Sequence, residues 1–360
     1  MAAGPDLMTS SVFITADWGS TNLRVYLCQH HLVQDHLVED HLVEGLLVER
    51  HLVEPSASSA TEPLRVLATK SGPGVLHINE GSFEETFFDL VADWLEVHGP
   101  LRVLLSGAVG STVGWRDAPY LDCPVDAEQI IAGRTVFQAR GLEFLIVSGL
   151  KTQGPLGAPD LMRGEELQLL GWMRLQSKQV TEQVIILPGT HNKWVLVKND
   201  RVETFATALT GELYSLLENH SILITEPQEE PFSADWFMQG VNLAKRLQSG
   251  QLLQALFTTR SRQVAGDLST QQARSYLSGL LVGADILGSI GLFKDQVAQL
   301  NKVVLIGDST LTHAYQLALK SFAIEAQICD STEIAMAGYQ AIYESLAIDN
   351  AIDNAKNEER

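Results

Sequence analysis

A polar turn between two apolar runs occurs at two places in this 360-residue chain. The first turn, "DWGSTN" at residues 17–22, separates strand-like runs at 12–16 and 23–27. The second, "PGTHNK" at 188–193, separates runs at 182–187 and 194–197. A simple hairpin needs only about two turn residues, such as Asn-Gly. These longer turns, rich in glycine, hydroxyl and amide groups, therefore point to ligand binding as well as chain reversal.

The segments after the two turns also correspond. The first turn is followed by a strand at 64–70 and a helix-period stretch at 83–99, and the second by a strand at 202–207 and a helix at 210–221. A strand, a turn and a helix come later, at 301–320. A duplicated unit of this kind predicts an α/β chain with mixed sheets and two similar domains, residues 1–150 and 151–360. The length fits two domains. We expect them to face each other across a cleft, where ligands commonly bind.

Residues 31–54 form a tandem pentapeptide, "HLVQD HLVED HLVEG LLVER HLVE". A spacing of five residues matches neither one face of a helix nor the alternation of a strand. We interpret the repeat as an insert in a surface loop, since loops tolerate insertions, and not as a metal site. Five of the ten histidines lie in or beside it: His30, His31, His36, His41 and His51.

The charge of the chain excludes some classes of partner. The formal net charge is -19, which argues against binding nucleic acid through phosphates or binding an anionic membrane. The three cysteines are far apart and odd in number, which indicates reduced thiols and a cytoplasmic location. The N-terminus does not resemble a signal peptide, and we expect no membrane-spanning segment.

The first turn carries groups that suit a metal-bound phosphate. Asp17 ends an apolar strand, where a carboxylate can hold Mg²⁺ against nucleotide phosphates, directly or through water. Gly19 allows close approach of the backbone, and the residues after it can donate hydrogen bonds to phosphate oxygens. These residues are Ser20, Thr21 and Asn22.

The second turn is predicted to hold phosphate from the opposite side. Gly189 and Thr190 can surround a phosphate group, and Lys193 can neutralise its charge. Between them, His191 and Asn192 complete the predicted nucleotide-binding turn. No Walker A sequence and no G-x-G-x-x-G after the first strand occur, so P-loop and Rossmann chemistry are not indicated.

A third strand-to-helix turn, "LIGDST" at 305–310, is a candidate for adenosine contact. Gly307 would let a flat ring come close, and Ser309 or Thr310 could cap the following helix. A purely structural turn explains the same residues equally well.

The segment "APDLMRGEELQLLGWM" at 158–173 is the best candidate for the chemical step. We expect Asp160 at the N-cap of a helix, with Arg163, Glu165 and Glu166 in its first turn. Acidic residues there are also expected from the helix dipole alone. A carboxylate in this segment could act as general base, and the arginine could bind an acidic substrate.

Residues 106–115, "SGAVGSTVGW", form a glycine-rich stretch after a strand. Ser106 and Gly107 could wrap a small polyol, and Trp115 could form a wall of the site. An ordinary loop with an apolar anchor is the alternative.

These motifs together, with "TALTGELY" at 207–214, resemble the 2-dehydro-3-deoxygalactonokinase family of the sugar kinase, hexokinase, actin and Hsp70 superfamily. The resemblance covers the chain except the pentapeptide insert and both tails. It implies two ribonuclease-H-like (actin-like ATPase) domains that close on ATP, Mg²⁺ and a sugar acid. The implied reaction is phosphorylation of the 6-hydroxyl of 2-dehydro-3-deoxy-D-galactonate in galactonate catabolism.

Residue roles follow from this resemblance by position. Asp17 matches the first phosphate turn, and Gly189 with Thr190 matches the second. A carboxylate just before the second turn acts as base in related kinases, which favours Glu165, with Asp160 as the competitor.

Several alternatives stay open at this stage. The substrate carboxylate requires a cation, for which Arg163, Arg24 and Arg116 are candidates. The chain could act on another sugar acid or a polyol, or be a non-catalytic sugar-acid sensor. Whether it is a monomer or a homodimer is also open.

Overall fold

The computed structural model describes residues 10–31, 62–78, 82–224 and 232–358. The pentapeptide insert from residue 32 onward, with His36, His41 and His51, lies outside the described residues. The chain divides into two compact units, one of residues 1–105 and 136–145 and the other of residues 106–135 and 146–360. Whether residues 1–150 and 151–360 fold as separate domains stays a prediction, as does a cleft between them.

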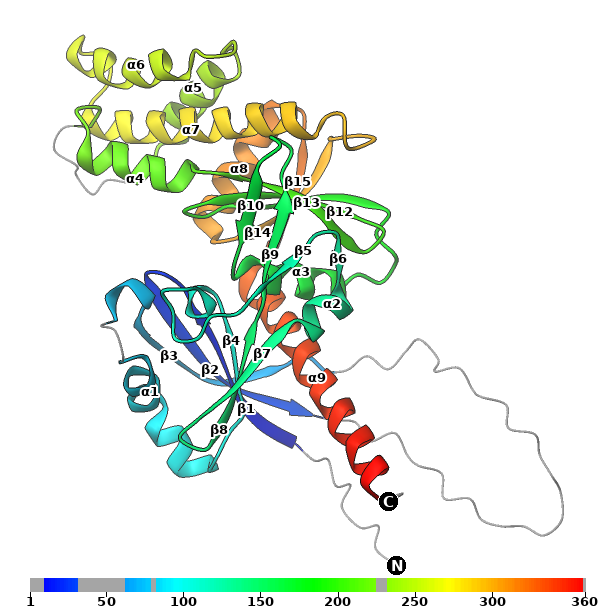
Figure 1. Ribbon diagram of the computed structural model, residues 1–360. Coiled ribbons are helices and arrows are strands. Elements are labelled where there is room, and N and C mark those ends of the chain that lie inside the picture. The colour runs from blue at the N-terminus through cyan, green and yellow to red at the C-terminus, as the bar shows by residue number, and fades with distance from the viewer. Residues whose placement is uncertain (1–9, 32–61, 79–81, 225–231, 359–360) are drawn as a thin grey trace, which may run out of the picture. The chain divides into compact units, whose positions relative to one another are not determined.

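The first unit is built on a six-stranded sheet in the order β3-β2-β1-β4-β8-β7 (Figure 1). The strands β1 and β2 pair antiparallel, and so do β2 and β3. Helix α1 (Phe83–His98) buries five apolar residues: Phe83, Phe87, Phe88, Val91 and Trp94. The strands are β1 (Ser10–Trp18), β2 (Asn22–His31), β3 (Arg65–Pro73), β4 (Val103–Ser106), β7 (Arg134–Ala139) and β8 (Leu142–Val147).

Aromatic side chains fill the core of this unit below the first polar turn. Trp18, the last residue of β1, is fully buried and packs edge-on against Phe83, with ring centroids 5.6 Å apart. Phe87 lies between Trp18 and Phe144, and its ring centroid is 5.2 Å from that of Phe144. The turn at 17–22 therefore stands on a rigid base, since its first residues continue directly into the core.

The second unit contains another six-stranded sheet, in the order β15-β14-β11-β12-β13-β6. Strands β11, β12 and β13 form an antiparallel meander, whereas β14 and β15 join β11 in parallel. A three-strand meander extended by parallel strands is the ribonuclease-H-like arrangement, so the predicted α/β class is confirmed. The strands are β11 (Glu182–Leu187), β12 (Asn192–Lys198), β13 (Arg201–Ala208), β14 (Lys302–Gly307), β15 (Glu325–Asp330) and β6 (Val125–Asp126).

Helices cover this second sheet. One core cluster joins its apolar face to α5 (Ala234–Ala244), α7 (Thr270–Phe293) and α8 (Ser309–Ser321). A second cluster joins α5 and α7 to α4 (Thr210–His220) and α6 (Leu252–Val264) in a helical layer (Figure 1). Helix α9 (Ser331–Glu358) packs on α3 (Glu165–Arg174) so closely that Gly171 has no room for a Cβ atom, which would lie 1.9 Å from the carbonyl oxygen of Ile334.

Helix α7 is long and apolar. Among the described residues, it is the single helix whose length and composition would allow it to cross a membrane. Most of its most apolar stretch is buried inside the chain. An apolar helix of this kind is required where α4, α5 and α6 surround it, because it is then apolar on nearly every side.

The remaining elements of the second unit are short. A three-stranded sheet has the order β10-β9-β5. Its strands are β5 (Tyr120–Asp122), β9 (Gly149–Gln153) and β10 (Pro159–Met162), and the short helices nearby are η2 (Ala108–Gly110) and α2 (Ala127–Ala132). Strand β10 of this small sheet leads directly into α3, and it therefore positions the "RGEE" segment at residues 163–166.

Candidate active site

The first polar turn is held by a second segment of the chain. The N–H of Gly19 donates to the carbonyl oxygen of Asn22 (2.9 Å), which closes the turn on itself. Residues 74–76 then run across it, because Gly74 N–H donates to Thr21 O (3.1 Å) and Val75 N–H to Gly19 O (3.0 Å). A Cβ atom at Gly74 would lie 2.2 Å from the carbonyl carbon of Thr21. Sequence analysis missed Gly74, although "SGPG" at the end of a strand is a turn signal.

Two predicted site residues lie opposite each other at this turn. Asp17 on β1 is half-buried and pairs in register with Arg24 on β2, whose side chain is exposed. The exposed residues Ser20, Thr21 and Asn22 follow, and the Asn22 amide donates to the Thr21 hydroxyl (3.3 Å). The turn thus offers a carboxylate, a guanidinium and hydroxyl groups within the first unit.

The second polar turn is closed by its own asparagine. The N–H of Gly189 donates to Oδ1 of Asn192 (2.7 Å), so this amide is already used inside the turn. The carbonyl oxygen of Thr190 accepts from Glu212 N–H (2.9 Å), which attaches the turn to the first residues of α4. A Cβ atom at Gly211 would lie 2.3 Å from Gly189 O, so the helix approaches closely only because glycine stands there. The side chains of His191 and Glu212 are also hydrogen-bonded across this contact.

A buried carboxylate fixes the orientation of Asn192. The side chain of Asp285 on α7 accepts from Asn192 Nδ2 (3.0 Å), Trp194 Nε1 (3.1 Å) and the hydroxyl groups of Ser289 (3.1 Å) and Tyr315. Burial raises the pKa of Asp285, and these hydrogen bonds oppose that rise. Sequence analysis missed this group, yet its signal was present: a single acid inside the apolar stretch of residues 276–293.

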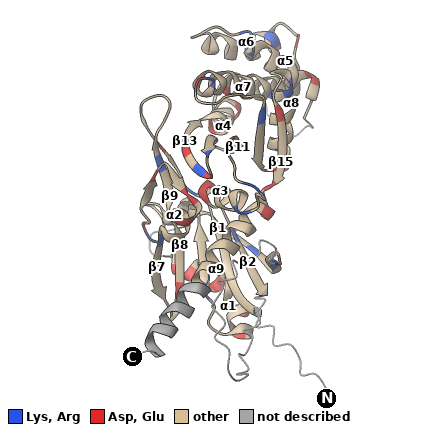
Figure 2. Ribbon diagram, turned by 90° about the vertical axis from the view of Figure 1, so that its right-hand side faces the viewer, with Lys and Arg blue, Asp and Glu red and all other residues tan. Residues whose placement is uncertain are grey.

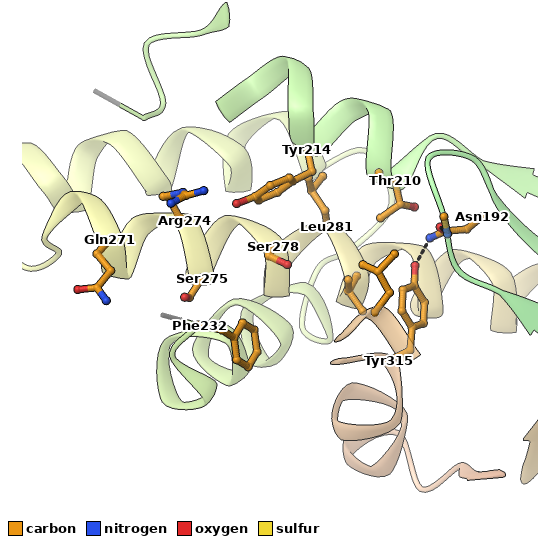
Figure 3. A pocket seen from close by; sticks show the side chains of 14 residues that line it. Asn192, Thr210, Tyr214, Phe232, Gln271, Arg274, Ser275, Ser278, Leu281 and Tyr315 are labelled. Atoms are coloured by element: carbon orange, nitrogen blue, oxygen red, sulfur yellow. Dashed lines mark hydrogen bonds between the residues drawn. The ribbon is translucent and has the colours of Figure 1, made fainter. Parts of the chain in front are cut away.

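A cavity of about 250 Å³ opens beside the second turn (Figure 3). Gly189, Asn192 and the first residues of α4 bound one end, and Tyr315 contributes a ring there. Side chains of α7 and the aromatic residues Tyr214 and Phe232 line the rest. Arg274 on this wall pairs with Glu218, and burial raises the pKa of Tyr214 to about 12, so its phenol is neutral. A cavity of mixed polar and aromatic lining that ends at a polar turn can hold a nucleoside whose phosphates extend along the turn.

Gly307 lies near this region but does not line the cavity. A Cβ atom there would be 3.1 Å from the carbonyl oxygen of Pro188, so the residue packs against the second turn. Helix α8 starts at Ser309, and its cap is the carboxylate of Asp308, which accepts from the N–H groups of Thr310 (2.9 Å) and Leu311. The expected capping by Ser309 or Thr310 is therefore wrong, because the preceding carboxylate takes that role.

The "RGEE" segment lies differently from the sequence expectation. Asp160 is not an N-cap, because residues 159–162 form strand β10, antiparallel to β9. Its carboxylate instead accepts from Thr207 N–H (2.7 Å), the Thr207 hydroxyl (2.6 Å) and Leu161 N–H (2.8 Å). Helix α3 begins at Glu165, with Gly164 at the N-cap at a φ of 110°, a conformation that favours glycine.

The two glutamates at the start of α3 differ in environment. Glu165 is partly exposed, and its Oε2 accepts from Arg163 N–H (3.1 Å) while Oε1 lies 3.5 Å from Nζ of Lys193. Glu166 is fully buried; Oε2 accepts from Gly164 N–H (2.6 Å), and Oε1 has no partner among the described residues. Burial, and secondarily the charge of Glu165, raises the pKa of Glu166 to about 8, so it carries a proton at neutral pH.

The glycine-rich stretch adjoins this segment. The Cα atom of Gly107 lies 3.4 Å from the position of a Cβ at Gly164, and a Cβ at Gly110 would lie 2.8 Å from Nη1 of Arg163. The Arg163 guanidinium stacks on Tyr120 (4.3 Å) and donates from Nη2 to Ala118 O (2.6 Å). Its Nη1 is buried and has no partner among the described residues.

The structure therefore brings the glycine-rich stretch, "RGEE" and Lys193 together in the second unit, and Figure 2 shows acidic and basic segments near α3. Ser106 is buried with its hydroxyl bonded to Tyr339 (2.7 Å), while Trp115 is half-buried and Arg116 exposed. No group of three potential metal-binding side chains gathers among the described residues.

Comparison with known proteins identifies the family. The family model described as 2-keto-3-deoxy-galactonokinase matches residues 58–342. The chain belongs to the 2-keto-3-deoxy-galactonokinase family. It is 32% identical to the 2-dehydro-3-deoxygalactonokinase of Escherichia coli (strain K12), over 93% of this chain and 98% of that protein. It is also 32% identical to DgoK1 of Rhizobium meliloti (strain 1021), described as a probable 2-dehydro-3-deoxygalactonokinase, over 67% of this chain and 77% of that protein.

A solved structure agrees with this membership. The crystal structure of a Sinorhizobium meliloti protein assigned to the 2-dehydro-3-deoxygalactonokinases superposes with a TM-score of 0.71 and 26% identity, over 92% of this chain and 96% of that chain. The family resemblance that the motifs predict is confirmed. As a member of the 2-keto-3-deoxy-galactonokinase family, the chain is an enzyme: an ATP-dependent kinase, hence a transferase, of carbohydrate metabolism.

Proposed function

We propose that this chain transfers the γ-phosphoryl group of ATP to the 6-hydroxyl of 2-dehydro-3-deoxy-D-galactonate, through the residues gathered around α3 and the two polar turns. The observation that carries the residue assignment is the ion pair of Glu165 and Lys193, which places a carboxylate next to the second turn. Galactonate catabolism in the cytoplasm is the setting that we propose for this reaction.

Glu165 is the general base in this proposal. A base must be ionised and within reach of the acceptor hydroxyl. Glu166 is buried and protonated at neutral pH, and all the hydrogen bonds of Asp160 go to neighbouring protein groups. Glu165 is partly exposed, and it alone of the three has an oxygen directed at a cation, Lys193. It would orient the hydroxyl and accept its proton as the oxygen attacks the γ-phosphorus and the bond to ADP breaks.

The nucleotide lies along the second turn and the cavity beside it. Because Gly189 N–H is used by Asn192, we assign the phosphate contacts to the backbone amides of Thr190 and His191, next to the start of α4. A helix N-terminus favours anions through its dipole. The base and ribose would occupy the cavity between α4 and α7, where aromatic and hydroxyl side chains are available.

Arg163 is the cation that we assign to the substrate carboxylate. Its unpartnered Nη1 is the reason for preferring it to Arg24 or Arg116, since a buried guanidinium nitrogen needs an acceptor. The stack on Tyr120 keeps the guanidinium plane fixed. Gly110 lets the guanidinium lie against the backbone, since a Cβ atom there would be 2.8 Å from Nη1.

The proposal includes Mg²⁺ bound at the first turn. Mg²⁺ in kinases typically takes only one or two carboxylates, with phosphates and waters as its other ligands, so a single carboxylate at the end of β1 fits this metal. Asp17 would hold it, directly or through water, and Mg²⁺ when bound would neutralise phosphate charge. Gly19, Ser20, Thr21 and Asn22 would supply amides and hydroxyls to the phosphates.

Coupled ADP release tests the proposal. The assay would contain ATP and Mg²⁺ with 2-dehydro-3-deoxy-D-galactonate, its gluconate epimer or galactose. We expect turnover with the galactonate compound, and its loss in Asp17→Asn and Glu165→Gln. Turnover with only one of the other acceptors would show that this acceptor is the substrate instead. ATP binding without turnover on any acceptor would favour a sensor.

A further inference from the structure

The hydrogen bonds around Asp285 connect the interior of the second unit to the second polar turn. Asp285 is 9% exposed, and its carboxylate collects donors from three elements: Asn192 and Trp194 on β12, Ser289 on α7 and Tyr315 on α8. Four donors on one buried carboxylate exceed what packing of a helix on a sheet requires, since apolar residues there would be less costly.

The two carboxylate oxygens have different partners. Oδ1 accepts from Trp194, a member of the core cluster, and from Ser289, and neither residue lines the cavity beside the turn. Oδ2 accepts from Asn192 and Tyr315, which line the cavity beside the turn. Tyr315 also accepts a hydrogen bond from Asn192 Nδ2, as Figure 3 shows. Only the Oδ2 side therefore leads to the proposed nucleotide site.

Asn192 transmits this arrangement to the turn. With its Nδ2 group held by Asp285 and Tyr315, its Oδ1 atom is directed to Gly189 N–H at 2.7 Å. That bond fixes the backbone at Gly189, directly before Thr190 and His191, whose amides face the phosphates in the proposed function. A displacement of about 1 Å in such a group can cost a kinase about a hundredfold in rate.

We propose that Asp285 is a positioning residue for phosphoryl transfer: through Asn192 and Tyr315 it holds the second turn in the geometry that binds the phosphates of ATP. The inference rests on the proposed function, because it assumes that the turn binds those phosphates. It adds a role for the side chain of Asn192 within the turn and for those of Asp285 and Tyr315 outside it.

A double-mutant cycle tests this role. Asp285→Asn and Asn192→Ala are each expected to lower kcat/KM for ATP by about tenfold to a hundredfold. The KM for the sugar acid should stay near the wild-type value. The double variant should be no worse than the poorer single variant, because both changes break one chain of contacts. Additive losses in the double variant would overturn the proposal.

Ser289→Ala is the matched control, because it removes a donor from Oδ1 and leaves the Oδ2 side unchanged. We expect it to lower the unfolding midpoint in urea without changing kcat or KM for ATP. If Asp285→Asn behaves like Ser289→Ala, with lost stability and normal kinetics, the positioning role is wrong. If Asp285→Asn does not fold, Tyr315→Phe is used for the test instead. We expect calorimetry to show a raised Kd for ATP in this variant. An unchanged Kd would contradict the proposal.

The wild-type chain separates the two levels of inference. Wild type that neither turns over nor binds ATP would overturn the proposed function and the positioning role together. If the wild-type chain phosphorylates the sugar acid and Asp285→Asn has the same kinetics, only the positioning role is overturned.

Discussion

The ammonium group of Lys193 lies 3.5 Å from Oε1 of Glu165, and the Lys193 side chain is only 5% exposed. Lys193 is the second residue of β12, and Glu165 is the first residue of α3. The contact therefore joins the end of the second polar turn to the start of the "RGEE" helix. A lysine so deeply buried requires an anion, and Glu165 supplies it.

Glu165→Gln should lower kcat strongly while the protein remains folded. Loss of a general base costs about 10²- to 10⁴-fold, and glutamine keeps the acceptor for Arg163 N–H. Asp160→Asn is the matched comparison, because it disturbs the bonds to Thr207 without removing a base. We expect lost stability but retained turnover there. Steady-state kinetics and urea unfolding check both; an active Glu165→Gln with an inactive, folded Asp160→Asn would reverse the assignment.

Glu166 should make the free energy of unfolding depend on pH. Its pKa is about 8 in the folded chain, against an ordinary value of 4.5. Between about pH 4.5 and 8, the unfolded chain loses this proton while the folded chain keeps it, so stability falls as pH rises through that window and this contribution is constant above it.

Glu166→Gln removes this contribution, because glutamine stays neutral and still accepts from Gly164 N–H. The free energy of unfolding of the variant, relative to wild type, should therefore increase from pH 5 to pH 8. Urea unfolding at several pH values measures the difference. A difference that does not change with pH would show that Glu166 is ionised in the folded chain.

Gly189→Ala tests the second turn with little steric ambiguity. A Cβ atom at Gly189 would meet no protein atom within 4 Å, so stability should change by less than about 0.5 kcal/mol. The KM for ATP should nevertheless rise about tenfold or more, because the methyl group would stand where phosphate approaches. Gly288→Ala, whose Cβ also meets nothing within 4 Å, is the control and should be kinetically normal. Normal KM for ATP in Gly189→Ala would place the phosphates elsewhere.

Arg163→Lys should raise the KM for the sugar acid and leave the KM for ATP unchanged. Lysine keeps the charge but loses the stack on Tyr120 and the directed Nη1 group. A charge-assisted hydrogen bond contributes about 1.5–3 kcal/mol, which corresponds to roughly tenfold to a hundredfold in KM. An unchanged KM would shift the substrate carboxylate to Arg24 or Arg116, and Arg24→Lys assayed in parallel would distinguish them.

The sequence predicts the fold of this chain better than its site. Short apolar runs on both sides of a polar turn are typical of buried strands, so the sequence predicts β1, β2, β11 and β12, and the duplication predicts the two larger sheets. Asp160 was misplaced because its side chain suits an N-cap, yet pairing of β10 with β9 decided its conformation. The conformational preference of a single residue does not reveal such pairing between strands.

Contacts far apart in sequence explain the residues that were missed. Asp285 meets Asn192 across 93 positions, and Gly74 meets Thr21 across a segment that contains the pentapeptide insert. Neither partner carries a local signal of the other. Glu166 could not be separated from Glu165 by sequence, because only the packing around α3 makes one buried and the other partly exposed.

Gly74→Ala should disrupt the first polar turn, although Gly74 lies outside it. The backbone at Gly74 is ordinary, with φ −75°, so the effect is steric: a Cβ would lie 2.2 Å from Thr21 C and 2.5 Å from Ser20 O. The turn must move, at a cost of about 3 kcal/mol, and residues 74–76 lose their hydrogen bonds to it. We expect a lower urea midpoint and a higher KM for ATP.

Gly72→Ala, two residues earlier and in strand β3, is the matched control. Its Cβ would meet only side-chain atoms of Leu23 and Leu90 at 3.4 Å, which is ordinary van der Waals contact. It should therefore remain close to wild type in both stability and KM for ATP. If Gly74→Ala loses stability but keeps a normal KM for ATP at a temperature where it is folded, the first turn does not contribute to nucleotide binding. Asp17 would then need a role other than holding Mg²⁺ beside the phosphates.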